Sequence, residues 1–275
     1  MSKITIKKIQ SWKNSKLFSA ITAYDFSSAK IIDECGIPVV LVGDSAAMVA
    51  YGYDTTVPIT MDEMLLVAKA VSRGVKSALV VGDMPFLSYQ SSISMAVKNA
   101  GRFLKEGGAS AVKLEGGRVI SKHINKIVEF GIPVMGHVGL TPQSVNQFSG
   151  YAVQGKDVRS AQKVLDDARA VEDAGAFAVV LECIPRELAT KITESLSIPT
   201  IGIGSGPDCD GQIQVFHDIL GIIKNFTPKH AKLYANLNKK ITSALTAYKN
   251  EVSKKQFPKT KHSSSYKSNI IDKLQ

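Results

Sequence analysis

Cysteine and tryptophan are scarce in this sequence of 275 residues, which contains three cysteines and one tryptophan. Cys35, Cys183 and Cys209 are odd in number and widely spaced, and no C-x-x-C pair or other metal-ligand spacing occurs. A disulfide framework and a cysteine-based metal site are therefore both disfavoured. The pattern instead predicts reduced thiols and a cytoplasmic location.

Long apolar runs are also missing. No stretch reaches the roughly 18 residues that a membrane-spanning helix needs. The first residues, which include Lys3, Lys7 and Lys8, lack the apolar core of a signal peptide. We therefore expect no membrane partner.

Positive charge is in excess, with a formal net charge of +10. The extra lysines lie mainly in the first helix-like segment and in the tail. No aromatic residues interleave with them, as a platform for stacking bases would require. Solvated lysines therefore explain the charge better than a nucleic-acid partner does. A basic RNA-binding protein is the alternative, and it predicts binding with a steep salt dependence.

Short apolar runs alternate with helical patterns along most of the chain. The clearest run, at residues 39–42, is rich in valine and is typical of a strand buried on both faces. Eight strand–helix units with no linker between them predict a single-domain α/β fold, the (β/α)₈ TIM barrel, which typically needs about 250 residues. A doubly wound open sheet is the alternative. The expected strands span residues 18–25, 39–42, 77–81, 111–115, 132–136, 177–181, 198–203 and 213–216.

Helical segments are expected at both ends of this barrel. Residues 3–16 have the pattern of an amphipathic N-terminal helix. A C-terminal helical extension over residues 230–248 is expected to close the globule. We place the catalytic barrel domain at residues 1–250 and a Lys/Ser-rich C-terminal tail at residues 251–275, where order is less expected.

Polar residues follow several of the predicted strands at their carboxyl ends. In a barrel these ends form the face that carries the active site. Any one such residue is equally compatible with a helix cap or a turn, but a group of them on one face predicts a polar active site. The group comprises Asp44, Ser45, Asp83, Lys113, Glu115, His137 and Glu182.

Lys113 and Glu115 share one face of their strand, because side chains alternate along a strand. Opposite charges on one face of a buried strand are costly unless they are paired or functional. We expect Lys113 to pair with an acidic substrate. A Schiff-base mechanism on Lys113 is disfavoured, because the nearby Glu115 would keep the ammonium protonated.

Three of the carboxylates, with no thiolate nearby, favour a hard cation such as Mg²⁺. Such a cation polarises a carbonyl group and stabilises a developing enolate. Glu182, the remaining carboxylate, is then a candidate general base. These residues therefore predict proton removal at a carbon next to a keto acid. A phosphate-binding loop at residues 202–206 is a second, weaker signal.

Several longer stretches near the strand ends form a specific combination: residues 22–25, 43–45, 56–62, 83–89, 112–116, 136–143, 181–182 and 209–212. In this combination the chain resembles the ketopantoate hydroxymethyltransferase family, from about Ile4 to the tail. The resemblance implies a barrel that assembles as a homo-oligomer, commonly a decamer. It also implies 5,10-methylenetetrahydrofolate as co-substrate and one-carbon donor. The reaction would convert 3-methyl-2-oxobutanoate to 2-dehydropantoate in pantothenate biosynthesis.

The resemblance also implies roles for the residues at the strand ends. Mg²⁺ would be held by Asp44 and Asp83, with Glu115 in or near its coordination shell, and Glu182 would remove the proton from C3 of the keto acid. His137 is a candidate to contact these residues without binding the metal itself. Substrate contacts would come from Asp44, Ser45, Asp83 and Lys113. A related metal-dependent carbon–carbon lyase or mutase is the alternative, but the reactive cysteine loop expected of that class is absent from the sequence.

Overall fold

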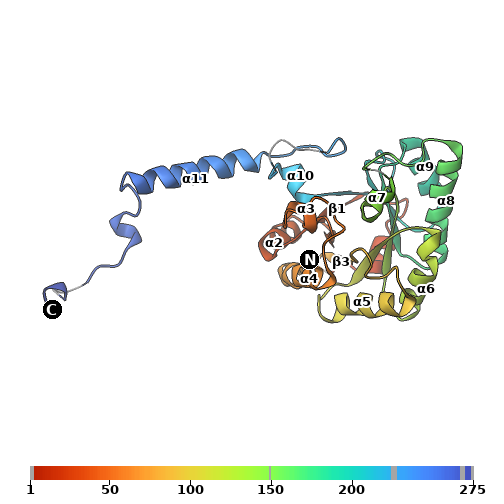
Figure 1. Ribbon diagram of the computed structural model, residues 1–275, viewed down its shortest axis with the longest axis horizontal. Coiled ribbons are helices and arrows are strands. Elements are labelled where there is room, and N and C mark those ends of the chain that lie inside the picture. Colours follow the sequence, from red (N-terminus) through yellow and green to blue (C-terminus); the bar gives the residue numbers. More distant parts are fainter. Residues whose placement is uncertain (1–2, 149, 224–227, 267–269, 274–275) are drawn as a thin grey trace.

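Eight parallel strands close into a barrel in the computed structural model, which describes residues 3–148, 150–223, 228–266 and 270–273 (Figure 1). The strands follow one another around the barrel in sequence order, and β8 pairs with β1. The predicted (β/α)₈ barrel is confirmed, and the open-sheet alternative is wrong. The strands are β1 (Phe18–Thr22), β2 (Val39–Val42), β3 (Leu79–Asp83), β4 (Ala111–Glu115), β5 (Val134–Gly139), β6 (Ala178–Glu182), β7 (Thr200–Ile203) and β8 (Gly211–Gln214).

Helices surround the barrel, and four of the six outer ones begin at a residue whose side chain caps the first turn. Thr60 accepts a hydrogen bond from the Glu63 backbone, while the Glu63 side chain accepts one from the Thr60 backbone, so the first turn of α4 is satisfied from both sides. The outer helices are α2 (Phe26–Glu34), α4 (Met61–Gly74), α5 (Ile93–Lys105), α6 (Ser121–Glu129), α8 (Val158–Asp173) and α9 (Arg186–Ser195). Shorter pieces are α1 (Ile6–Gln10), α3 (Ala46–Val49), α7 (Val145–Phe148), α10 (Phe216–Leu220), η1 (Arg118–Ile120), η2 (Pro142–Ser144), η3 (Thr260–His262) and η4 (Ile271–Lys273).

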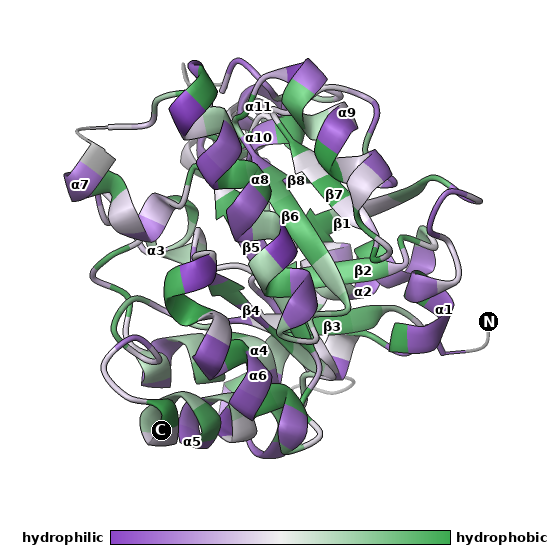
Figure 2. Cartoon of the chain, turned by 90° about the vertical axis from the view of Figure 1, so that its right-hand side faces the viewer, coloured by the Kyte–Doolittle hydropathy of each residue, from purple (hydrophilic) through white to green (hydrophobic). Residues whose placement is uncertain are grey.

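The strands bury both of their faces, which explains their continuous apolar runs. On β2, Val40 and Val42 pack in the layer between strands and helices, whereas Val39 and Leu41 pack in the barrel interior. Figure 2 shows the apolar strands enclosed by helices that carry hydrophilic residues. The core therefore consists of two layers, and alternation along each strand decides which layer a side chain enters.

Two glycines allow helices to lie directly on the strands beside the polar residues. A Cβ atom at Gly82 would lie 2.3 Å from the Phe103 ring of α5, and one at Gly136 would lie 2.1 Å from Val171 of α8. Both distances are far inside van der Waals contact, so any larger residue would push the helix away. Glycine at these two positions thus keeps the strand segments that carry Asp83 and His137 tightly supported.

The amino-terminal end of the barrel is closed by the start of the chain. Ile9 and Trp12 pack with Phe18 in the interior layer, and the Trp12 and Phe18 rings lie 5.6 Å apart. The predicted helix over residues 3–16 is too long, since α1 ends at Gln10. Asn14 adopts a left-handed backbone conformation, which asparagine tolerates better than most residues, and the chain turns there towards β1.

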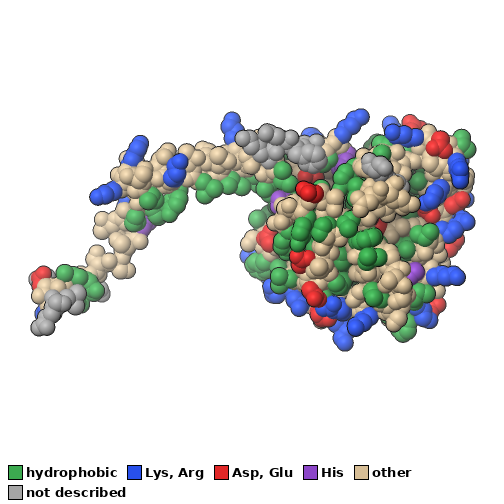
Figure 3. Space-filling view, viewed as in Figure 1, with side chains coloured by type: hydrophobic (Ala, Val, Ile, Leu, Met, Phe, Trp, Pro, Cys, Tyr) green, Lys and Arg blue, Asp and Glu red, His purple; other side chains and the backbone are tan. Residues whose placement is uncertain are grey.

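The C-terminal helix α11 (Leu237–Ser253) projects away from the barrel (Figure 1). The C-terminal helical extension is confirmed, but the expectation that it spans residues 230–248 and closes the globule is wrong. None of its residues is buried, and Figure 3 shows hydrophobic side chains along one side of this arm. The domain boundary at residue 250 stays a prediction. The exposed large apolar residues of the helix are Ile241, Leu245, Tyr248 and Val252.

Smaller differences concern element boundaries. The eighth strand lies at Gly211–Gln214 instead of residues 213–216, and the third begins at Leu79 instead of residue 77. Within the described ranges, no helix is both long enough and apolar enough to cross a membrane.

Candidate active site

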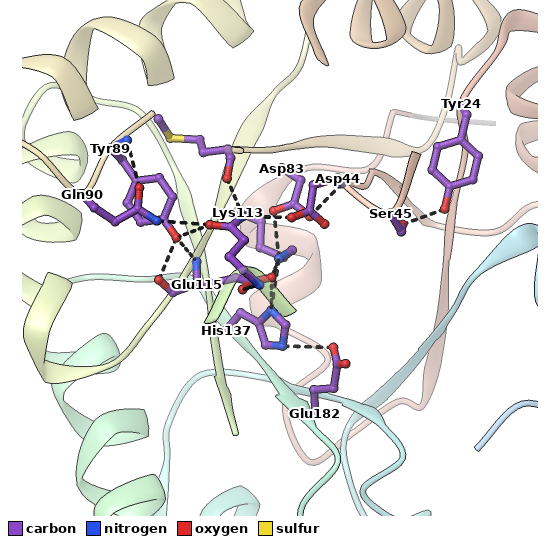
Figure 4. A network of polar contacts seen from close by, with 12 residues as sticks. Tyr24, Asp44, Ser45, Asp83, Tyr89, Gln90, Lys113, Glu115, His137 and Glu182 are labelled. Carbon is purple, nitrogen blue, oxygen red and sulfur yellow. Dashed lines mark hydrogen bonds and ion pairs between the residues drawn. The ribbon is translucent and has the colours of Figure 1, made fainter. Parts of the chain in front are cut away.

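Strand alternation brings most of the predicted site residues into one buried cluster at the carboxyl end of the barrel (Figure 4). The inward-facing positions on four strands start with apolar residues of the interior layer and end with polar ones. Strand register then places neighbours side by side, because Asp83 pairs with Lys113 and Glu115 pairs with His137. The inward series are 79–81–83 on β3, 111–113–115 on β4, 135–137 on β5 and 178–180–182 on β6.

Lys113 lies in the middle of this cluster. Its Nζ atom is 2.8 Å from Asp83 Oδ1, 3.6 Å from Glu115 Oε1 and 3.1 Å from His137 Nδ1. Burial alone would lower the pKa of Lys113, but the negative charges of Asp83, Glu115 and Asp44 outweigh it and raise the pKa above its usual value. Lys113 therefore stays protonated and is a poor nucleophile. A contact between Lys113 and a substrate stays a prediction.

Asp44 and Asp83 are buried carboxylates at adjacent strand ends, and the Asp44 backbone N–H donates to Asp83 Oδ2 at 3.2 Å. Burial, together with the charges of Asp83 and Glu115, raises the pKa of Asp44 well above its usual value. Burial also raises the pKa of Asp83, although the Lys113 ammonium opposes the shift. Asp44, Asp83 and Glu115 face a single ammonium. Ionised, they leave two negative charges uncompensated.

This donor set suits a hard divalent cation. Within the described residues, no three His, Cys, Asp or Glu side chains stand at metal-binding spacing; the Lys113 ammonium lies among the carboxylates instead. Mg²⁺, however, is commonly held by one or two carboxylates and completes its shell with water and substrate oxygens. Asp44 and Asp83 therefore fit as its ligands. Glu115 is a less direct candidate because it contacts His137 as well as Lys113, whereas Asp83 contacts Lys113 and, among the described residues, no histidine.

His137 connects Glu182 to the rest of the cluster. Its Nε2 atom lies 3.2 Å from Glu182 Oε2, and its Nδ1 atom lies 3.4 Å from Glu115 Oε1. Burial and the Lys113 ammonium would lower the pKa of His137, but contacts with Glu115 and Glu182 raise it on balance. The Glu182 side chain is 15% exposed, whereas that of Glu115 is 3% exposed. Glu182 is thus the carboxylate of this group that an incoming molecule can reach.

Ser45 lies apart from the ion pairs, on the side of the site towards β1 (Figure 4). Its hydroxyl oxygen is 2.8 Å from the Tyr24 hydroxyl. Ser45 begins the short helix α3 but makes no side-chain cap hydrogen bond there. Its hydroxyl is therefore held by Tyr24, beside the Asp44 carboxylate and outside the Lys113 network.

Comparisons with known proteins bear on this cluster. The model of a family described as ketopantoate hydroxymethyltransferase matches residues 3–260. The chain belongs to the ketopantoate hydroxymethyltransferase family. It is 56% identical to a protein of Carboxydothermus hydrogenoformans named 3-methyl-2-oxobutanoate hydroxymethyltransferase, over 100% of both chains. It is 52% identical to one of the same name from Clostridium botulinum, over 99% of both chains. Family membership makes this protein an enzyme of the transferase class.

Solved structures with low sequence identity share the barrel. Phosphonopyruvate hydrolase matches with a TM-score of 0.62 at 13% identity, over 99% of this chain and 94% of the other. 2,3-Dimethylmalate lyase matches with a TM-score of 0.62 at 16% identity, over 99% and 91%. At such identities the likeness shows the fold alone.

Two residues of the cluster were not predicted from the sequence. Tyr89 and Gln143 are buried and contact the residues that carry the carboxylates. Both lie in stretches that carried the family resemblance, which was the available signal. Nothing in their local pattern indicates their partners, because Gln143 and Asp44 are 99 positions apart.

Proposed function

We propose that this enzyme transfers a hydroxymethyl group from 5,10-methylenetetrahydrofolate to 3-methyl-2-oxobutanoate, which gives 2-dehydropantoate. The names of the relatives support hydroxymethyl transfer to this keto acid. One observation carries the chemistry: the accessible Glu182 carboxylate lies on the same face as the buried, charge-rich pair of Asp44 and Asp83. That arrangement suits proton removal next to a carbonyl.

Mg²⁺ is the cation we propose for this site. Asp44 and Asp83 would hold it, with Glu115 in or near the coordination shell. When bound, Mg²⁺ polarises the keto carbonyl and stabilises the negative charge that develops as the C3 proton leaves. The cluster sets three carboxylates, those of Asp44, Asp83 and Glu115, against the one ammonium of Lys113, and this excess of acidic groups supports a divalent ion rather than a monovalent one.

The side chains divide the remaining work. Glu182 takes the C3 proton, since it is the most exposed of the four carboxylates at the site. Among the described residues, its one ionisable partner is His137, which pairs with it as a cation only when protonated. His137, 3.2 Å away, orients Glu182. Lys113 stays charged and holds Asp83 in place. The Ser45 hydroxyl, held by Tyr24, is positioned to bind the keto acid.

The test is one assay with three omissions. Purified protein is incubated with 3-methyl-2-oxobutanoate, methylenetetrahydrofolate and Mg²⁺, and the product is identified by mass spectrometry. We expect 2-dehydropantoate only when all three are present. Full turnover in protein stripped of metal with EDTA would contradict the metal assignment. In a separate experiment, borohydride is added to the protein with the keto acid. A covalent adduct on Lys113, trapped by reduction and detected by intact mass, would show a Schiff-base mechanism instead.

Location and assembly are further parts of this proposal. Reduced cysteines favour the cytoplasm, and the family resemblance supports a homo-oligomer, commonly a decamer. The lack of aromatic residues among the lysines argues against a nucleic-acid partner, and the lack of long apolar runs argues against a membrane partner. Light scattering on the full chain measures the mass directly. A monomer at micromolar concentration would contradict the oligomer.

A further inference from the structure

We propose that Gln143 is a positioning residue that orients the carboxylates of Asp44 and Glu115 towards the proposed Mg²⁺. This role rests on the proposed function, because it presumes that a cation binds there. Gln143 is 4% exposed and belongs to η2, which follows β5 after Leu140 and Thr141. Its backbone and its side chain reach different strands of the site.

The contacts of Gln143 join two strand ends. Its backbone N–H donates to Glu115 Oε2 at 3.0 Å, and its side-chain Nε2 donates to Asp44 Oδ2 at 2.9 Å. A second hydrogen bond from Nε2 reaches the Met84 carbonyl oxygen at 2.9 Å, directly after Asp83. Among the described residues, Gln143 makes the one side-chain hydrogen bond to the Asp44 carboxylate.

The orientation of this amide is determined by its neighbours. Its two N–H groups face oxygen acceptors, namely Asp44 and Met84. Its carbonyl oxygen faces donors, with Gln90 Nε2 at 3.2 Å and the Tyr89 hydroxyl at 3.0 Å. A flipped amide would point its oxygen at the Asp44 carboxylate and its N–H groups at the Gln90 amide. The amide therefore has one favourable orientation, which aims a donor at Asp44.

Tyr89 extends the same network to the backbone of Glu115. Its hydroxyl accepts a hydrogen bond from the Glu115 N–H at 3.0 Å, and its single hydrogen is shared between the Glu115 carbonyl at 2.8 Å and Gln143. The Tyr89 side chain is fully buried. Tyr89 thus fixes the main chain of Glu115, and Gln143 fixes its carboxylate. Gln143 also links this pair to Asp44.

The position of Gln143 follows from its local sequence. Pro142 occupies the first turn of η2, where its missing N–H costs no hydrogen bond. This turn directs the Gln143 N–H at Glu115. Hydrogen-bonded partners of metal ligands restrict the ligand to the orientation that binds. Without Gln143, the Asp44 carboxylate would have to be ordered by the cation itself.

The test measures Mg²⁺ binding by calorimetry on the full chain of wild type and Gln143→Met. Methionine keeps the length of the side chain and removes its hydrogen bonds to Asp44 and Met84, whereas the backbone hydrogen bond to Glu115 remains. We expect Mg²⁺ to bind about 10–100-fold more weakly. The Mg²⁺ concentration for half-maximal rate should rise in the same proportion, whereas kcat at saturating Mg²⁺ should fall less, because the Asp44 and Glu115 carboxylates themselves remain. The matched control is Gln212→Met. The Gln212 amide donates to the Gly206 carbonyl oxygen instead of to a carboxylate of the site, so this variant should bind Mg²⁺ like wild type.

Tyr89→Phe is the second variant and removes a single hydroxyl. We expect a smaller loss of Mg²⁺ affinity, about tenfold or less. The double variant should lose less than the sum of the two, because Tyr89 and Gln143 belong to one network joined by the hydrogen bond between the Tyr89 hydroxyl and Gln143 Oε1. If Gln143→Met does not fold, the Tyr89→Phe measurement decides. Wild-type Mg²⁺ affinity in the folded variants would overturn the role of Gln143 alone. Failure of the wild-type enzyme to bind Mg²⁺, with or without keto acid, would overturn the metal site and this role together.

Discussion

Asp44 and Asp210 are buried to the same extent, each 5% exposed, at opposite ends of one barrel. Asp210, at the amino-terminal end, accepts hydrogen bonds from the backbones of Asn14 and Thr200 and pairs with Lys13 Nζ at 2.9 Å. Burial would raise its pKa, but these donors outweigh burial and lower it. At the other end, burial and neighbouring carboxylates raise the pKa of Asp44.

The contrast separates a structural carboxylate from one available to a ligand. Asp210 is surrounded by donors that the chain itself supplies, so its charge stabilises the turn between the start of the chain and β8. Asp44 has one side-chain donor among the described residues, Gln143, and two carboxylates beside it. Its charge is therefore costly until a cation arrives. The same degree of burial thus has opposite consequences at the two ends.

The largest expected effect concerns Glu182, the open carboxylate of the carboxyl end. Glu182→Gln should slow deuterium exchange at C3 of 3-methyl-2-oxobutanoate in D₂O by about 10²–10⁴, because a positioned general base contributes that much. Binding of keto acid and Mg²⁺ should persist. NMR without folate follows the exchange, and Glu187→Gln on the surface of α9 is the control. Exchange at the wild-type rate would remove Glu182 from the mechanism and make His137 the next candidate.

Asp210→Ala should lower the free energy of unfolding by about 3–5 kcal/mol, because it leaves the largely enclosed Lys13 ammonium, whose side chain is 10% exposed, without its carboxylate partner. Mg²⁺ affinity should not change, since the residue lies at the other end. Urea denaturation measures the loss. Glu129→Gln, which breaks an exposed pair with Lys126, should cost less than about 1 kcal/mol. Equal losses in the two variants would refute the structural role of Asp210.

Asp83→Asn should have the reverse profile. It should weaken Mg²⁺ binding more than the 10–100-fold expected from losing a partner of a ligand, because a ligand itself is lost. The metal-free fold should survive, since one of three neighbouring carboxylates becomes neutral. Calorimetry and thermal unfolding measure both properties, with the exposed Asp62→Asn as control. Unchanged Mg²⁺ affinity would exclude Asp83 as a ligand.

The smallest expected effect is a difference in pH dependence. The pKa of Asp44 is raised on folding, so its ionisation destabilises the metal-free protein above pH 3.8 and the penalty is complete only above its folded pKa. At a pH above the folded pKa of Asp44, Asp44→Asn should therefore raise Tm, by about 2–4 °C for each kcal/mol gained in the free energy of unfolding. The gain should vanish in acid. With saturating Mg²⁺, the Tm of Asp44→Asn should no longer exceed that of the wild type.

Asp210→Asn should behave in the opposite way. The pKa of Asp210 is lowered on folding, so its stabilisation is complete above pH 3.8 and is lost as the pH falls through its folded pKa. The variant should be less stable than wild type at neutral pH, and the difference should shrink in acid. Thermal unfolding from pH 3 to pH 8 compares both variants. Parallel pH profiles for Asp44→Asn and Asp210→Asn would show that the two carboxylates do not differ as described.

The sequence by itself determined the barrel and the face that carries the site. Apolar runs such as Val39–Val42 and the alternation of Lys113 with Val112 and Leu114 are local patterns, and local sterics translate them into strands with known faces. Asp44, Asp83, Glu115 and His137 were found in this way, because each lies at or near the carboxyl end of its own strand. The family resemblance then gave them roles.

Only the tertiary structure decided which of these side chains touch. Lys113 pairs first with Asp83, and His137 stands between Glu115 and Glu182, because strand register sets these neighbours and no local pattern encodes register. Gln143 meets Asp44 across 99 positions of the chain. The apolar stripe of α11 predicts a buried face but not its partner, so its projection away from the barrel could not be foreseen. Periodicity determines which face is apolar, whereas contacts between distant segments depend on how the whole chain packs.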